Sequence, residues 1–311
     1  MIPIIMDMLF GRLSFNPIDR NSYRGTRIMG ADIFKALTLK GRVLLQDKEH
    51  SDWCISYRLL DQKMTYKLHF RETDKGMRMH VMLRGHLLLK KQEGPPIELK
   101  PDDYFFANLN QYKLMPRKGG KAVMMVLHIE RLSTGLSDNP SVLIDNGIYQ
   151  LSTIMKDTVN DMLYHSYNDI LLDEFYDLSI REMFFRHLNT NNTRLSDTRK
   201  GHIQYVLNAA DHINDDLAVQ QDIVQMAHLV GSNDFTVKSV TRQMFRLGLG
   251  QYRMQQRMRM ARKLLATTEM PVHEIAIKVG YRTASGFITQ FVKLFSLTPL
   301  EWRATHKNQP A

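Results

Sequence analysis

Apolar and polar residues change their spacing twice along the chain. Over residues 31–130, short apolar runs alternate with turn signals, and runs such as 77–83 are compatible with β-strands. Several short strands at a spacing of about ten residues are typical of an antiparallel sandwich or barrel. We therefore expect an antiparallel β domain over 31–130. Residues 1–30 show no clear period and are expected to be loosely ordered.

Helical spacing begins near Ile148. Apolar residues three and four positions apart predict two amphipathic helices within 145–190. The polar stretch 189–200 has no apolar face and predicts a linker. Helical periodicity resumes at His202 and continues to about 306, which predicts an all-α C-terminal region.

The segment 222–246 has the pattern of a short helix, a glycine turn and a second helix. Gly231 can adopt the left-handed conformation that ends a helix, and Asn233 is a good N-cap for the next one. Val237 begins an apolar series that continues at helical spacing to Phe245. Together these features predict a helix-turn-helix motif.

The same pattern returns in 271–295. Gly280 follows Gly231 by 49 positions, and Phe287 follows Val237 by 50. Two such motifs at a nearly fixed offset indicate a DNA-binding region much more strongly than one motif does. The predicted structural residues of the two motifs and of the short helix after them are Gly231, Gly280, Phe287, Phe291, Phe295 and Trp302.

A helix predicted over 251–267 connects the two motifs. At 1.5 Å per residue it spans about 25 Å, which with the helix widths approaches the ~34 Å between successive major grooves. One chain can therefore place two recognition helices in adjacent grooves. The connecting helix is rich in arginine, and two interpretations stay open for each side chain, namely phosphate contact and a solvated helix face.

The net charge of +10 is unevenly distributed. Residues 1–131 carry a net +9, residues 132–219 a net −7 and residues 220–311 a net +8. A basic terminal block suits a protein that binds the phosphate backbone, although ordinary surface charge for solubility is the alternative. The single cysteine, Cys54, excludes an intrachain disulfide and favours a reducing cytoplasm. No apolar run is long enough to span a bilayer, and no signal peptide is expected.

At this point the C-terminal third resembles a known family. Residues 202–303 look like the DNA-binding domain of the AraC/XylS family of bacterial transcription regulators, and we place this domain at 202–306. The first motif departs from the family pattern at Ser239, Thr241 and Arg246. The residues that match are Met226, Ala227, Gly231, Tyr252, Arg257, Met258, Ala261, Leu264, Leu265, Ile275, Ala276, Val279, Gly280, Tyr281, Ser285, Phe287, Phe291, Phe295, Thr298, Pro299, Trp302 and Arg303.

The resemblance implies that each second helix reads bases with its first two turns. Lys238 can donate to guanine, whereas the small residues of the second motif suit methyl contacts and positioning. The alternative for Thr283 and Ser285 is that they only cap their helix. The expected base contacts are Phe235, Thr236, Lys238, Ser239, Arg242, Thr283, Ala284, Ser285 and Thr289, and the expected DNA-backbone contacts are Arg253, Arg257, Arg282 and Lys293.

Residues 79–108 are similar to the cupin-type sensor domain of many family members, which implies a small-molecule effector. A cupin-type metal enzyme with a DNA-binding tail is the alternative, but the histidines are scattered and form no His-x-His pair. We therefore predict no catalytic residue, metal or cofactor. The resemblance also implies that the acidic helical segment 145–190 joins two subunits, with an intramolecular brace as the alternative.

The sequence thus predicts an α+β protein with a cupin-like antiparallel β barrel, a helical middle segment and a C-terminal double helix-turn-helix domain. Its expected function is that of a cytoplasmic, sequence-specific transcriptional regulator, an activator that works as a homodimer. The expected partners are double-stranded DNA, RNA polymerase and an effector, with no membrane. An architectural DNA binder without sequence preference is a further alternative.

Overall fold

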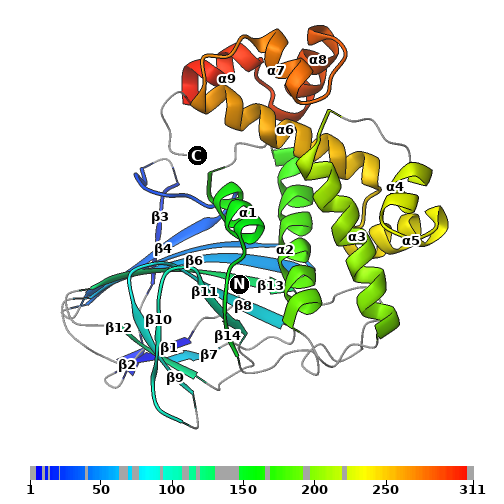
Figure 1. Cartoon of the computed structure of the whole chain (residues 1–311). Coiled ribbons are helices and arrows are strands. Elements are labelled where there is room, and N and C mark those ends of the chain that lie inside the picture. The colour runs from blue at the N-terminus through cyan, green and yellow to red at the C-terminus, as the bar shows by residue number, and fades with distance from the viewer. Residues whose placement is uncertain are drawn as a thin grey trace. The chain divides into compact units, whose positions relative to one another are not determined.

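The chain divides into two compact units, Met1–Tyr164 and His165–Ala311, which are described separately (Figure 1). The computed structural model describes residues 5–8, 11–12, 15–20, 22–38, 41–62, 69–71, 77–91, 94–106, 112–116, 120–129, 147–164, 169–191, 197–218 and 223–306.

The first unit is built from antiparallel sheets, as the alternating pattern predicts. Its largest sheet among the described residues runs in the order β14 (Ile148–Gln150), β11 (Asp103–Phe106), β8 (Met77–Arg84), β13 (Lys121–Ile129), β6 (Trp53–Gln62), β5 (Gly41–Glu49), β4 (Asp32–Thr38) and β3 (Asn16–Ile18). A second sheet has the order β10 (Ile97–Leu99), β9 (Leu87–Lys91) and β12 (Tyr112–Pro116), and a third has β2 (Gly11–Arg12), β1 (Ile5–Met8) and β7 (His69–Arg71).

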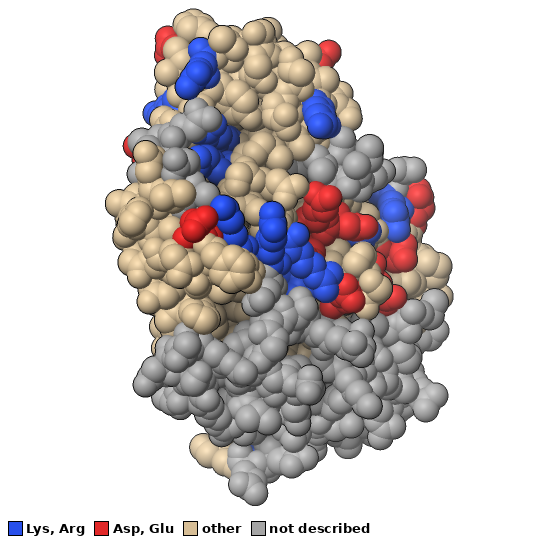
Figure 2. Space-filling model, turned by 90° about the vertical axis from the view of Figure 1, so that its right-hand side faces the viewer, with Lys and Arg blue, Asp and Glu red and all other residues tan. Residues whose placement is uncertain are grey.

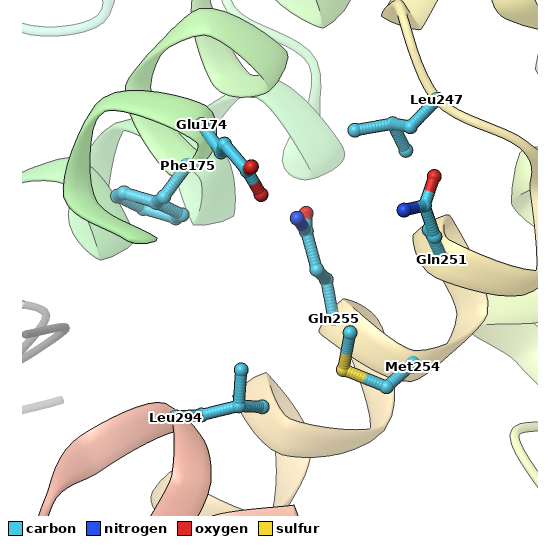
Figure 3. Close-up of a pocket in the computed structure, with 7 residues that line it drawn as sticks. All are labelled: Glu174, Phe175, Leu247, Gln251, Met254, Gln255 and Leu294. Atoms are coloured by element: carbon cyan, nitrogen blue, oxygen red, sulfur yellow. The ribbon is translucent and has the colours of Figure 1, made fainter. Parts of the chain in front are cut away.

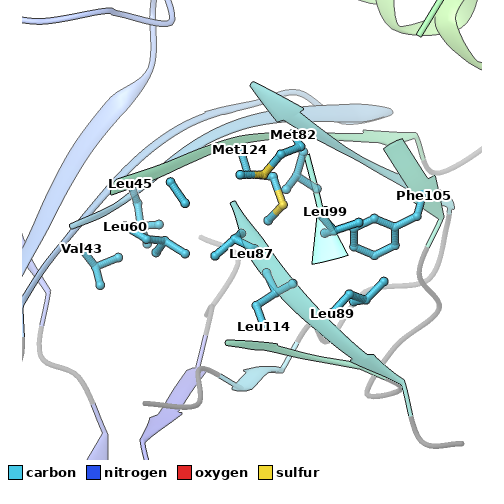
Figure 4. Packing of buried hydrophobic residues seen from close by; sticks show 12 residues of the cluster. Val43, Leu45, Leu60, Met82, Leu87, Leu89, Leu99, Phe105, Leu114 and Met124 are labelled. Carbon is cyan, nitrogen blue, oxygen red and sulfur yellow. The ribbon is translucent and has the colours of Figure 1, made fainter. Parts of the chain in front are cut away.

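One apolar core lies between the first two of these sheets (Figure 4). Val43 pairs with Leu60, and Met82 pairs with Met124, so these side chains share one face of the large sheet. Their counterparts on the smaller sheet are Leu87, Leu89, Leu99 and Leu114, each at most 1% exposed.

The turn before β11 contacts the start of the helix α1 (Thr153–Tyr164). Asp102 adopts a left-handed backbone conformation, with φ of 72°. Its carbonyl accepts the backbone N–H of Leu151 at 3.0 Å, and its carboxylate accepts Lys156 Nζ at 2.5 Å. Because aspartate tolerates this conformation better than most residues, the turn forms without glycine.

Three expectations about the chain's organisation differ from the structure. Residues 1–30 contain β1, β2 and β3 where no regular element was expected, because short edge strands bury few residues and leave no clear period. Parts of that segment lie outside the described residues. The predicted linker 189–200 is also wrong at both ends, since α2 (Asp169–Asn191) and α3 (Asp197–Asp215) extend into it. The terminal turn of a helix needs no apolar residue of its own when the rest of the helix packs, so it gives no periodic signal.

The third difference concerns α2. Every residue from 181 to 188 is buried, so this half of the helix is not amphipathic as its spacing suggested. The buried charges explain the misleading pattern, because Arg181 pairs with Asp177 and Arg186 pairs with Glu182 within the helix. The boundary between the two units, after Tyr164, lies inside the segment 145–190.

Every regular element among the described residues of the second unit is a helix. After α2 and α3 it contains α4 (Ile223–Leu229), α5 (Asp234–Phe245), α6 (Leu249–Thr267), α7 (Val272–Lys278), α8 (Ala284–Phe295) and α9 (Pro299–His306). Within the described part of the chain, none of the helices combines the length and the apolar character that a bilayer crossing demands.

Candidate nucleic-acid interface

Two helix pairs, α4–α5 and α7–α8, have the same turn geometry. Gly231 and Gly280 both have positive φ, 71° and 88°. In the first pair the N–H of Ser232 donates to the carbonyl of Ala227 at 2.8 Å, and in the second Tyr281 donates to Ala276 at the same distance. The repeat seen at an offset of 49 positions is therefore also a repeat of backbone structure.

The second helix of each pair begins at a capping side chain. Asn233 accepts the backbone N–H of Thr236 at 2.8 Å, and Thr283 accepts that of Gly286 at 3.2 Å. Ser285 Oγ lies 3.4 Å from Thr283 Oγ1. Thr283 is thus the N-cap of α8, and its proposed base contact has to be made from that position.

The outer face of α5 is charged and includes one large aromatic side chain. Phe235 is 77% exposed at the start of the helix. Lys238 and Arg242 are exposed, whereas Thr236 and Ser239 are half-buried. Lys238 Nζ donates to Asp234 Oδ2 at 2.9 Å, and this hydrogen bond holds the pKa of Asp234 below its usual value. The expected guanine donor is therefore shared with a carboxylate one turn away.

The outer face of α8 is small and uncharged until its last turn. Ser285 and Thr289 are exposed, and Ala284 is half-buried. The nearest exposed cations are Arg282, before the helix, and Lys293, in its last turn. The outer faces of α5 and α8 therefore differ, since α5 has charged and aromatic side chains where α8 has small uncharged ones.

The inner face of α5 packs on residues that come from α2 and α6. Phe245 stacks on Tyr252 with ring centroids 5.4 Å apart, and Phe185 of α2 meets Phe245 edge-on at 6.5 Å. Thr241 is fully buried, and its hydroxyl donates to the Val237 carbonyl at 2.6 Å. The threonine can occupy this apolar position because the helix itself satisfies its hydroxyl.

The inner face of α8 forms an aromatic cluster. Phe287, Phe291 and Phe295 are buried and successive rings lie 5.5 and 4.5 Å apart. Trp302 of α9, 3% exposed, lies 5.4 Å from the Phe295 ring. A capping box begins α9, because Thr298 and Glu301 exchange hydrogen bonds.

The arginines of α6 do not form a uniformly solvated face. Arg262 is only 7% exposed, and its guanidinium lies 5.6 Å from the Phe295 ring and 5.5 Å from the Trp302 ring. Arg253 and Arg257 are half-buried, and burial lowers the pKa of both guanidinium groups. The sequence analysis allowed only phosphate contact or a solvated face for these arginines, so it missed the buried position of Arg262.

A buried ion network joins α2 to α3. Arg186 Nη2 lies 2.8 Å from Glu182 Oε1 and 2.7 Å from Asp211 Oδ1. Beside it, Asn214 donates to the hydroxyl of Tyr252, whose pKa burial raises well above its ordinary value. Pairing satisfies charges that would otherwise be costly to bury, so the network fixes how these helices pack.

A small pocket opens between α2, α6 and α8 (Figure 3). Its volume is about 360 Å³ when the part open to solvent is included. Glu174 and the amide of Gln255 point toward each other across it, and the other lining residues are Phe175, Leu247, Gln251, Met254 and Leu294. On the face drawn in Figure 2, Lys and Arg side chains lie next to Asp and Glu, so the two signs are mixed there.

Comparison with known proteins identifies this region. Residues 226–305 match the family model described as "Helix-turn-helix domain". The C-terminal region is an AraC-type helix-turn-helix domain. This confirms the resemblance stated from the sequence. The AraC-type domain is a DNA-binding, non-enzymatic domain.

Solved structures that are similar to the chain come from three bacteria, among others. The C-terminal domain of AraT, a response regulator from Geobacillus stearothermophilus, is 26% identical, with 38% of this chain and 92% of that chain covered and a TM-score of 0.33. An AraC-type regulator from Chromobacterium violaceum is 21% identical, with 34% and 95% covered and a TM-score of 0.33. ToxT from Vibrio cholerae O395 is 14% identical, with 84% and 100% covered and a TM-score of 0.31. Among curated proteins, no sequence matches the chain.

Proposed function

We propose that the AraC-type domain contains two helix-turn-helix motifs, α4–α5 and α7–α8, which place α5 and α8 in adjacent major grooves of double-stranded DNA. The observation that carries this proposal is the repeated turn geometry at Gly231 and Gly280. In both pairs the start of the second helix has an exposed side chain, Phe235 or Ser285, whereas the opposite face of the helix is buried. That is the arrangement a recognition helix needs, because its first turns contact base edges.

The two motifs divide the work of recognition. The first motif contacts bases through a thymine methyl and through hydrogen bonds to base edges. The residues that make these contacts are Phe235, Thr236, Lys238, Ser239 and Arg242. Thr283, Ala284, Ser285 and Thr289 of the second motif supply methyl contacts and weak hydrogen bonds. Arg253, Arg282 and Lys293 contact phosphates, which fixes the register on DNA.

The remaining regions regulate this binding. The antiparallel unit is a cupin-like sensor for a small-molecule effector, and an effector that binds one arrangement of the sensor better shifts its population. The segment 145–190 joins two chains, so that linked sites raise the effective concentration on DNA. The homodimer acts in the cytoplasm as an activator that contacts RNA polymerase. Its expected mass at micromolar concentration is twice that of the chain, and a monomeric mass would contradict this part.

Selection from random DNA with the full chain tests the proposal. We expect enrichment of a site with two half-sites about 10 base pairs apart, centre to centre. Lys238→Ala should relax the preference at one base pair, by about 1–3 kcal/mol of discrimination. A uniform loss across sequences would make Lys238 a phosphate contact. If the chain enriches no sequence over random competitor at fixed salt, it is an architectural DNA binder instead.

A further inference from the structure

Arg257, in α6, contacts two other segments of the second unit. Its Nε donates to the carbonyl oxygen of Leu217, at the end of the segment that follows α3, at 2.8 Å. Its guanidinium carbon lies 5.7 Å from the centre of the ring of Tyr281, a residue in the turn between α7 and α8. The residue itself lies in the middle of α6. We call Arg257 and its neighbours Leu217, Gly280 and Tyr281 the Arg257 site.

The turn of the second helix pair lies directly against this side chain. A Cβ added to Gly280 would lie 2.4 Å from the Leu217 carbonyl oxygen and 2.6 Å from Arg257 Nη2. Gly231, the matching glycine of the first pair, has nothing within 4 Å of such an atom. Close contact with the turn is therefore a property of the second pair.

The guanidinium of Arg257 is poorly placed to bind a phosphate. Nε is occupied by Leu217, and Nη2 is buried and faces the Gly280 turn without a hydrogen-bond acceptor. Burial lowers the pKa of this group, with a smaller contribution from Arg253, although an arginine stays charged in water. One face of the guanidinium lies over the ring of Tyr281, and burial raises the pKa of that tyrosine. These contacts with protein groups leave the guanidinium little room to bind a phosphate.

We propose that Arg257 is a positioning residue, which holds the α7–α8 turn against the segment leading into α4 and so sets the orientation of one helix pair relative to the other. This inference rests on the proposed function of the two pairs. Arginine suits the role because its planar group can donate to a carbonyl in its plane while its face lies on an aromatic ring. Lysine, a point charge, cannot do both.

Binding of the full chain to its selected two-half-site DNA tests this role, with each half-site randomised in turn. For Arg257→Lys we expect the affinity for the intact site to fall about tenfold, because the two motifs no longer bind as a linked pair. The remaining binding should become insensitive to randomising the half-site of the second pair. Lys263→Ala removes an exposed cation from the same helix and is the matched control, which should keep its dependence on both half-sites.

A second variant keeps the test valid if Arg257→Lys folds poorly. Tyr281→Leu leaves the arginine and its charge in place but removes the ring beneath it, so we expect the same loss of dependence on the second half-site. A phosphate-contact role predicts instead that Arg257→Lys retains most of its affinity and both half-site dependences, and that Tyr281→Leu does the same; that result would overturn the inference. The proposed function fails separately, if the unaltered chain selects no two-half-site DNA.

Discussion

The two helix pairs of the AraC-type domain share a backbone plan but are stabilised from different sources. The second pair has an aromatic core of its own, in which Phe291 packs between Phe287 and Phe295 and against Trp302. At the position that matches Phe291, the first pair has Thr241. Its aromatic support comes from outside, through Tyr252 of α6 and Phe185 of α2.

The pair with the more complete core of its own is therefore not the pair with the more reactive outer face. The second pair is well packed but presents small, uncharged residues on its outer face. The first pair presents Phe235, Lys238 and Arg242, and depends on α2 for part of its core. The pair with the exposed aromatic and charged residues is therefore also the one whose packing includes α2, the helix that follows the antiparallel unit in the chain.

The largest expected effect comes from the second core. Phe291→Ala should lower the free energy of unfolding of this region by about 3–5 kcal/mol, because it leaves a cavity among aromatic rings. Thr241→Ala should cost only about 1 kcal/mol, since it removes a methyl group and a hydroxyl bonded within its own helix. Urea unfolding followed by the fluorescence of Trp302, in a Trp53→Phe background, measures the first variant. Hydrogen exchange over α5 measures the second, and equal costs would contradict the difference between the two cores.

Next in size is the dependence of the first pair on α2. Phe185→Ala should destabilise α4–α5 by about 3 kcal/mol, because Phe245 loses its edge-on neighbour. Hydrogen exchange resolved by segment should show faster exchange in α4–α5, with α7–α8 as the internal control. If both pairs change alike, the two pairs share one core after all.

The turn glycines should differ by a smaller amount. Gly231→Ala and Gly280→Ala both place a Cβ on a left-handed residue, at a cost of roughly 1–2 kcal/mol. In Gly280→Ala the added Cβ also clashes with the carbonyl oxygen of Leu217, so the midpoint of thermal unfolding should fall further for this variant than for Gly231→Ala. Similar midpoints for the two variants would show that the Arg257 site adjusts without cost.

The smallest effect is expected at Asp234. Its carboxylate lies at the surface and Lys238 lowers its pKa, so it is ionised at neutral pH, and the pair is lost only as the pH falls through that lowered pKa. Asp234→Asn should free Lys238 and strengthen DNA binding a few-fold at low salt, less so at high salt. Binding isotherms at two salt concentrations measure this, and weaker binding by the variant would show that Asp234 itself contacts a base.

Local features of the sequence were sufficient to predict both helix pairs, their glycine turns and the Asn233 cap, because each depends on residues within about one turn of one another. The roles of Arg257 and Arg262 could not be predicted in this way. Arg257 bonds to a carbonyl 40 positions away, and Arg262 lies over rings from α8 and α9. Helical spacing identifies a face of a helix, but it does not show which distant segment covers that face.

Hydroxyl-radical footprinting of the full chain on its selected DNA tests the central claim most directly. If α5 and α8 occupy adjacent major grooves, each bound chain should protect two patches about one helical turn apart on the same side of the duplex. Phe185→Ala should weaken the patch of the first pair and leave that of the second. A single protected patch per chain, or two patches on opposite sides of the duplex, would contradict the account.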